Sequence, residues 1–210
     1  MAAVMGAGRR DGIVFAPTDR LPAAATPRRG RPDVATHVAL FRGINVGKAK
    51  RIAMAELKAL FEALGYADVR TLLNSGNVVF DAGRGTPASH AKRIAAAVET
   101  RIGVSTNTLV LPAKALDAAI DGHPFGERAD DPSRLLVGFY LDDDRAPFEA
   151  LARAHPGEAF AVGADACYVW CADGILDSAV AAALGGAKFR DRVTARNWAT
   201  VLKLQAMMRP

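Results

Sequence analysis

The sequence predicts an α+β protein built from two packed ferredoxin-like (split βαβ) subdomains with antiparallel sheets, plus a C-terminal helix. Short apolar runs and helical periodicities follow each other in the order β-α-β-β-α-β between residues 37 and 111, which is the ferredoxin-like arrangement. The order β-α-β-β-α begins again at residue 135, although the residues themselves do not repeat. Because 210 residues divided in this way give each half only a small core, the two halves are expected to pack on each other.

The chain before residue 36 has a composition unlike the rest. Residues 1–35 are rich in Ala, Pro, Gly and Arg and show neither a helical nor a strand period, so we expect a disordered N-terminal tail. Its apolar stretch over 12–16 is stopped by Pro17 and is shorter than the core of an export signal. We therefore expect three parts: the tail over 1–35, a first ferredoxin-like subdomain over 36–111, and a second α+β subdomain with a C-terminal helix over 112–210.

A strand, a basic loop and a helix open the first subdomain. Residues 37–41 are an apolar run of strand length. Residues 42–51 contain two glycines and four basic side chains, which predicts a loop. Between Met54 and Leu64 the apolar residues recur at helical spacing, and Gly65 follows, so a helix is expected to end there.

A tight hairpin follows the first helix. Two short runs, over 69–73 and 78–80, flank the sequence NSGN at 74–77, where Gly76 suits a turn with positive φ. The subdomain then finishes with two elements that each stop at a structure-breaking residue: a helix over 88–102 before Gly103 and a strand over 106–111 before Pro112.

The second half shows the same alternation of periods. A helix over 113–120 leads into a loop containing glycine and prolines, and the apolar run over 135–141 is typical of a strand. Further elements are predicted by the same criteria: a helix over 146–154, strands over 159–162 and 167–170, and helices over 177–184 and 194–208. Thr194 is the expected N-cap of the last helix.

Composition and charge exclude several function classes. No apolar run approaches the roughly 20 residues that span a bilayer, so a membrane protein is not expected. The tail holds six Arg and three Asp, which leaves 21 basic and 19 acidic side chains for residues 36–210. This near neutrality, with no basic helix, argues against a nucleic-acid partner. Cys167 and Cys171 share one strand face at a separation of about 13 Å, too far for a disulfide, which fits reduced thiols and a cytoplasmic location.

One edge of the first subdomain is predicted to collect polar side chains. In a split βαβ unit the first two strands run the same way and the third pairs with the first, so the loop after residue 41 lies beside the hairpin at 74–77. The first helix also starts at this edge with its free N–H groups. Such a site suits a phosphate or a carboxylate, and its candidate residues are Arg42, Gly43, Asn45, Lys48, Ser75 and Asn77.

A purely structural interpretation of these residues is equally open. The glycines satisfy turn geometry on their own, the asparagines can cap nearby backbone groups, and basic residues before a helix are commonly solvated. The C-terminal segment poses the same choice. Arg196 and Asn197 are expected in the first turn of the last helix, where the helix dipole disfavours a cation. Arg196 therefore either pairs with a carboxylate or, with Asn197, binds an anion and completes the site.

A set of short stretches is recognisable together: LFRGINVG at 40–47, MAEL at 54–57, VRT at 69–71, SGNVVF at 75–80, PF at 124–125, TARNWAT at 194–200 and KL at 203–204. In these stretches the chain resembles the bacterial family of unknown function DUF1697. The resemblance runs from Thr36 to the end of the chain and implies paired ferredoxin-like subdomains, with no established activity. Members commonly carry a glycine where this chain has Lys48, which implies a less permissive loop here.

The sequence favours a cytoplasmic protein that binds a small phosphate- or carboxylate-bearing ligand at the edge formed by the RGINVG loop and the NSGN hairpin. Arg42 would pair with the charge, Asn45 and Asn77 would orient polar groups, and Ser75 would donate a hydrogen bond. Two alternatives stay open: a protein-interaction or oligomerisation module whose motifs lock the subdomains together, and a weak nucleic-acid binder. No acid, base or nucleophile is identifiable, so the sequence does not decide whether the protein is an enzyme. Neither a cofactor nor a metal is expected, and the oligomeric state is open.

Overall fold

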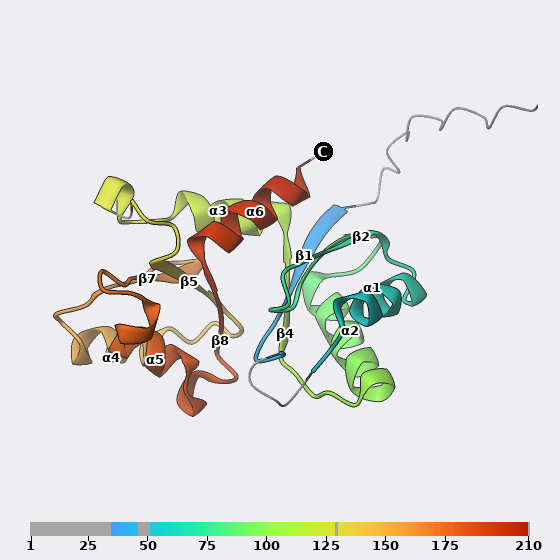
Figure 1. Cartoon of the computed structure of the whole chain (residues 1–210), viewed down its shortest axis with the longest axis horizontal. Helices are drawn as coiled ribbons and strands as arrows, with labels where there is room; N and C mark the ends of the chain where they lie inside the picture. The colour runs from blue at the N-terminus through green and yellow to red at the C-terminus, as the bar shows by residue number, and fades with distance from the viewer. Residues whose placement is uncertain (1–34, 46–50, 129, 210) are drawn as a thin grey trace, which may run out of the picture. The chain divides into compact units, whose positions relative to one another are not determined.

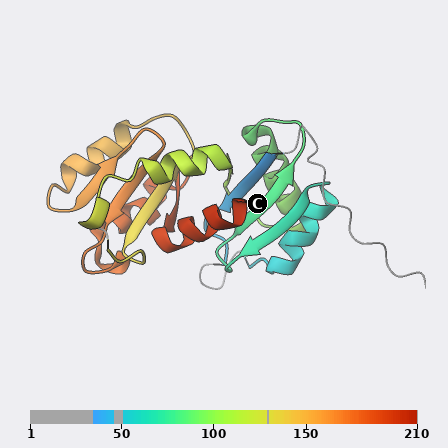
Figure 2. The same cartoon turned by 90° about the horizontal axis from the view of Figure 1, so that it is seen from above.

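Two four-stranded antiparallel sheets form the framework of the protein. The computed structural model describes residues 35–45, 51–128 and 130–209. The strand orders are β2-β3-β1-β4 in the first sheet and β6-β7-β5-β8 in the second, with every neighbouring pair antiparallel (Figures 1 and 2). Both orders are those of a ferredoxin-like unit, so the predicted fold class is confirmed. The predicted tail lies outside the described residues, apart from Ala35, which begins β1.

The elements of the first half lie close to their predicted positions. They are β1 (Ala35–Phe41), α1 (Met54–Ala63), β2 (Ala67–Leu72), β3 (Asn77–Ala82), α2 (Pro87–Ile102) and β4 (Thr108–Pro112). Helix α2 begins with a capping box, in which the Thr86 side chain accepts from the Ser89 N–H and the Ser89 side chain accepts from the Thr86 N–H. It ends at Gly103, whose φ of 75° closes the helix in the left-handed region.

The second half repeats this plan more completely than the sequence predicts. Helix α3 (Ala113–Asp121) closes the first half, and the elements of the second half are β5 (Leu135–Tyr140), α4 (Ala146–Ala154), β6 (Ala159–Val162), β7 (Ala166–Trp170), α5 (Ala179–Gly185), β8 (Val193–Asn197) and α6 (Trp198–Met208). Each fourth strand is followed by one further helix, α3 after β4 and α6 after β8. The two halves are therefore two copies of the order β-α-β-β-α-β-α.

The predicted helix over 194–208 was wrong at its start. Residues 193–197 form β8, which pairs with β5 and places Val193 opposite Tyr140. Asn197 is the N-cap of α6, because its side chain accepts from the Thr200 N–H. The buried Thr194 is in the strand and is not the cap. Pairing with a neighbouring strand decided the conformation of this segment, and a local reading of the sequence does not include that contact.

Three clusters of buried side chains hold the layers together. The first lies between the first sheet and helices α1 and α2, and the third between the second sheet and helices α4 and α5. The middle cluster joins Val38 and Val79 of the first sheet to Val137 of the second, through Leu116 of α3 and Leu204 of α6. Figures 1 and 2 both show α3 and α6 side by side between the sheets. No helix in the described part of the chain is long and apolar enough to cross a bilayer.

Candidate functional site

The loop after β1 lies against the β2–β3 hairpin, as the predicted topology requires. The Phe41 N–H donates to the Gly76 carbonyl at 2.9 Å. Asn45 has a backbone φ of 57°. Its side chain donates to the carbonyls of Ile52 and Asn74, at 2.9 and 2.7 Å, and accepts from the Ile52 N–H at 2.8 Å. Asn45 therefore fastens the two ends of the basic loop to each other and to the hairpin.

Gly76 is required by the close approach of the hairpin to the end of β1. Its φ is +76°, and an added Cβ would lie 2.5 Å from Cδ1 of Ile44 and 2.8 Å from Cβ of Phe41. Gly43 has a similar φ of +68° but open space around the Cβ position. Gly43 is therefore needed only for its backbone conformation. Gly76 is needed for its backbone conformation and also because a side chain would not fit there.

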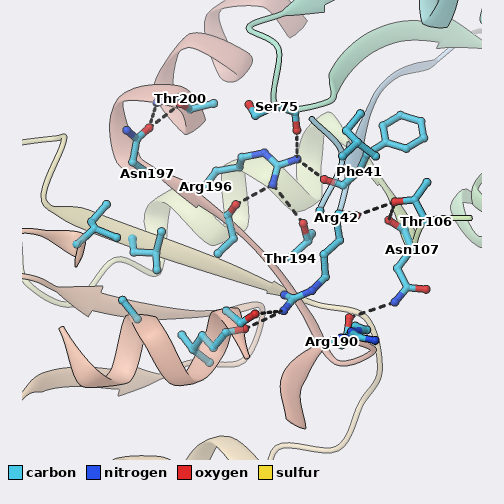
Figure 3. Close-up of a pocket in the computed structure, with 18 of the residues that line it drawn as sticks. Phe41, Arg42, Ser75, Thr106, Asn107, Arg190, Thr194, Arg196, Asn197 and Thr200 are labelled. Atoms are coloured by element: carbon cyan, nitrogen blue, oxygen red, sulfur yellow. Dashed lines mark hydrogen bonds between the residues drawn. The ribbon is translucent and has the colours of Figure 1, made fainter. Parts of the chain in front are cut away.

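Arg196 crosses from the second half of the protein to the first (Figure 3). It lies on β8 and is 9% exposed. All three nitrogens of its guanidinium donate to neutral oxygens: Nε to Oδ1 of Asn77, Nη1 to Thr194 Oγ1 and the Ala195 carbonyl, and Nη2 to the carbonyls of Phe41, Ser75 and Gly76. None of its described partners is a carboxylate, which goes against one of the two alternatives for this residue, the pair with a carboxylate. Arg196 lies on strand β8 and not in the first turn of the last helix, where it was predicted. Its side chain donates to backbone carbonyls.

Asn77 completes this junction from the first half. Its side chain is fully buried. Nδ2 donates to the Leu72 carbonyl at 2.9 Å and to Oγ of Ser75 at 3.0 Å, while Oδ1 accepts from Arg196. Asn77 therefore holds the hairpin in shape and orients the arginine.

Arg42 reaches the second half by a separate route (Figure 3). It is half-buried, and its terminal nitrogens donate to the carbonyls of Val193, Leu184 and Gly185. β8 is an edge strand of the second sheet. Because the Arg192 carbonyl accepts from Leu141, alternation along an antiparallel strand turns the carbonyls of Val193 and Ala195 away from β5. Arg42 and Arg196 therefore bind successive outward carbonyls of this edge.

Within the described residues, neither arginine forms a salt bridge with a carboxylate, and Asp191 is the nearby acidic group that acts on Arg42. Burial, followed by the positive charge of Arg42, lowers the pKa of Arg196 to about 10. Burial also lowers the pKa of Arg42, Asp191 opposes this, and Arg190 adds to it. Two partly desolvated cations that repel each other leave a positive potential in the space beside them.

That space is a groove of about 1010 Å³ between the loop and hairpin of the first half and β8 and α5 of the second. Of the residues predicted from the sequence, those lining it are Arg42, Gly43, Ser75, Arg196 and Asn197. Asn45 and Asn77 stand behind this lining, in the contacts described above. Lys48 lies outside the described residues.

Sequence reasoning missed several polar residues of the groove, among them Thr106, Asn107, Arg190 and Asp191. Thr106 donates to the Arg42 carbonyl at 2.8 Å, and the Asn107 side chain donates to the Arg190 carbonyl and to Oδ1 of Asp191. The start of β4 lies beside the end of β1 in any antiparallel pair, so the predicted topology already implied the position of 105–107. Arg190 and Asp191 gave no such signal because β8 was not recognised.

The described His, Cys, Asp and Glu side chains form no metal-binding cluster, and the two cysteines are buried. Across residues 35–45, 51–128 and 130–209, no group of three or more His, Cys, Asp or Glu side chains is placed to bind a metal ion. Cys167 and Cys171 are free and buried, and burial raises the pKa of the Cys167 thiol to about 12. A thiol in that state is a poor nucleophile.

Comparison with known proteins identifies the family. Residues 34–168 match the family described as "Protein of unknown function (DUF1697)". The chain belongs to the DUF1697 family. A solved structure, that of the conserved bacterial protein SP0830 from Streptococcus pneumoniae, matches with a TM-score of 0.67 and 21% sequence identity, covering 84% of this chain and 99% of that one. No curated protein matches the chain in sequence.

The range of the DUF1697 match divides the candidate site. It includes Arg42 and the hairpin with Asn77, and it ends at residue 168, before β8. The resemblance of residues 194–204 to the family therefore stays a prediction. The DUF1697 description and the structural match establish the fold and assign no activity.

Proposed function

We propose that this protein binds a small anion, carrying a phosphate or carboxylate group, in the groove beside β8. The observation that supports this proposal is the excess of positive charge in the groove. Arg42, Arg190 and Arg196 all line it, and Asp191 is the single carboxylate among its described lining residues. A bound anion would offset the mutual repulsion of Arg42 and Arg196.

Several donors remain for such a ligand. The Arg190 guanidinium is exposed and makes no hydrogen bond or ion pair with any residue in the described part of the chain. Arg42 uses its two terminal nitrogens for backbone carbonyls, and its Nε makes no hydrogen bond with a described residue. The Ser75 hydroxyl accepts from Asn77 and keeps its own hydrogen to donate. In this proposal Asn45 and Asn77 hold the loop and the hairpin in place, and Arg196 supplies charge from within the wall.

Thermal shift and calorimetry on the full chain test the proposal, with inorganic phosphate, pyrophosphate and citrate at two salt concentrations. An anion at 100 times its Kd should add about 2.7 kcal/mol, which raises Tm by several degrees. Arg190→Gln should abolish the shift and leave the Tm of the free protein unchanged. Arg153→Gln is the matched control, because Arg153 is an exposed arginine on α4 with a Glu149 partner at 4.0 Å. If no anion shifts Tm, or both variants respond alike, the proposal fails.

A second candidate is an interaction or oligomerisation module in which the same motifs only join the two halves. The observation that favours it is that every nitrogen of Arg196 is occupied by a protein oxygen. Under this alternative Arg42→Ala lowers Tm although no anion binds, and light scattering of the purified protein shows an assembly. Short RNA in the same screen addresses nucleic-acid binding, whose affinity would fall steeply as salt is raised.

A further inference from the structure

We propose that the anion carries an aliphatic chain, so that the ligand of this groove is an amphipathic acid. The inference rests on the proposed function and deepens it: Arg42 and Arg190 take the charged group, and an apolar wall takes the chain.

The groove is lined by both cationic and apolar side chains. Arg42 binds the carbonyl of Val193 at the start of β8, and Arg190 comes just before that strand. At the other end of β8, Asn197 lies opposite Leu136. Four residues of extended strand separate these ends by about 13 Å. The larger aliphatic residues that line the groove are Ile44, Leu73, Leu136, Ile175 and Leu184, of which Leu73 is the most exposed.

Leu73 is the residue that makes this wall unusual. Its side chain is 55% exposed, and its φ of 57° lies in the left-handed region, which a leucine adopts at an energetic penalty. Two unfavourable features at one position are expected where function requires them. Among the described residues the other exposed large hydrophobic side chains are Leu176, which directly follows the lining residue Ile175, and Leu202 on α6.

An aliphatic chain lying along this wall would cover the exposed Leu73 while its acidic group stays at the arginines. A purely polar anion of the same charge would leave the leucine in water. Since burying one methylene group is worth about a fourfold change in affinity, the length of the chain is a sensitive probe of this geometry.

Calorimetry on the full chain measures its affinity for butyrate, hexanoate and octanoate. Alkyl phosphates of the same chain lengths form a second series, and inorganic phosphate is the anion without a chain. Affinity should rise about fourfold for each methylene that the wall covers. The two series identify the preferred acidic group. Leu73→Ser should flatten the dependence on chain length without lowering Tm, because the side chain is exposed. Leu202→Ser, an exposed leucine outside the groove, is the matched control and should retain the full dependence.

The outcomes separate this inference from the proposed function. Binding of inorganic phosphate and of every acid with equal affinity, lost in Arg190→Gln, would overturn the aliphatic chain and keep the anion site. A length dependence that is equally reduced by both leucine substitutions, or by neither, would also overturn the inference. Failure of all of these anions to bind would overturn both proposals.

Discussion

The guanidinium of Arg196 donates to the side-chain oxygen of Asn77, 119 residues earlier in the chain, at 2.5 Å. The contact is buried on both sides and belongs to a network of backbone carbonyls at the end of β1 and in the β2–β3 hairpin. It is the contact by which one ferredoxin-like half orders the polar edge of the other.

Asn77→Ala should lower the free energy of unfolding by about 3 kcal/mol, because it leaves a buried guanidinium nitrogen and the Leu72 carbonyl without partners. Asn74→Ala is the control. Asn74 is exposed in the same hairpin and contributes its backbone carbonyl to Asn45, so its side chain can be removed with a change of no more than about 0.5 kcal/mol. Urea unfolding of both variants checks this, and equal losses would contradict the role given to Asn77.

Gly76→Ala should destabilise the protein by more than Gly43→Ala. Both positions carry the penalty of a left-handed residue, about 1–2 kcal/mol, since their φ values are +76° and +68°. Only at position 76 does the new methyl group also collide with Ile44 and Phe41, which adds about 1–3 kcal/mol. The difference between the urea unfolding midpoints of the two variants measures the cost of the collision at position 76. A larger effect at position 43 would show that the loop after β1 is packed differently.

Arg42→Ala should cost about 1–3 kcal/mol, because three backbone carbonyls lose a charged donor. The comparison is Arg192→Ala, which removes exposed ion pairs to Asp142 and Asp144 at 3.3 and 3.0 Å and should cost about 0–1 kcal/mol. High salt should leave the first loss unchanged and shrink the second. Salt-sensitive loss in Arg42→Ala would mean that its carbonyl contacts contribute little.

His90 should make the protein less stable as the pH falls below about 6.5. Burial, followed by the positive charges of His37 and Arg93, lowers the pKa of His90 from 6.5, and its Nε2 is buried without a partner among the described residues. The unfolded chain therefore takes up a proton at a higher pH than the folded protein does, and stability is lost between the unfolded and folded pKa values. Unfolding free energies measured between pH 8 and pH 5 should fall less steeply in His90→Phe than in the wild type.

The candidate site could be predicted from the sequence as far as strand order determines it. The position of Arg42 beside the hairpin follows from the pairing of β1 with β3, which a split βαβ pattern already implies. The hydrogen-bond partners of the two arginine side chains could not be predicted from strand order. Arg42 and Arg196 donate to carbonyls of segments more than 100 residues away in the chain, and any residue type can supply a carbonyl.

The misassigned start of the last helix has the same cause. Residues 193–197 carry a weak local preference, and their conformation depends on β5, which lies some 60 residues earlier. Once β8 is a strand, Arg196 points across the junction and Asn197 becomes the cap of α6. Recognising the second half as a full copy of the first would have required a fourth strand at that place.

Because Asn77 and Arg196 lie far apart in the sequence, they are synthesised at different times. The ribosome adds about 5–20 residues per second, so the carbonyls of Ser75 and Gly76 exist for roughly 6–24 s, and that of Phe41 for roughly 8–31 s, before the guanidinium that binds them is made. During that interval water must solvate the hairpin and the end of β1. A nascent first half can form its own sheet early, and it gains its final polar edge only when β8 has been synthesised.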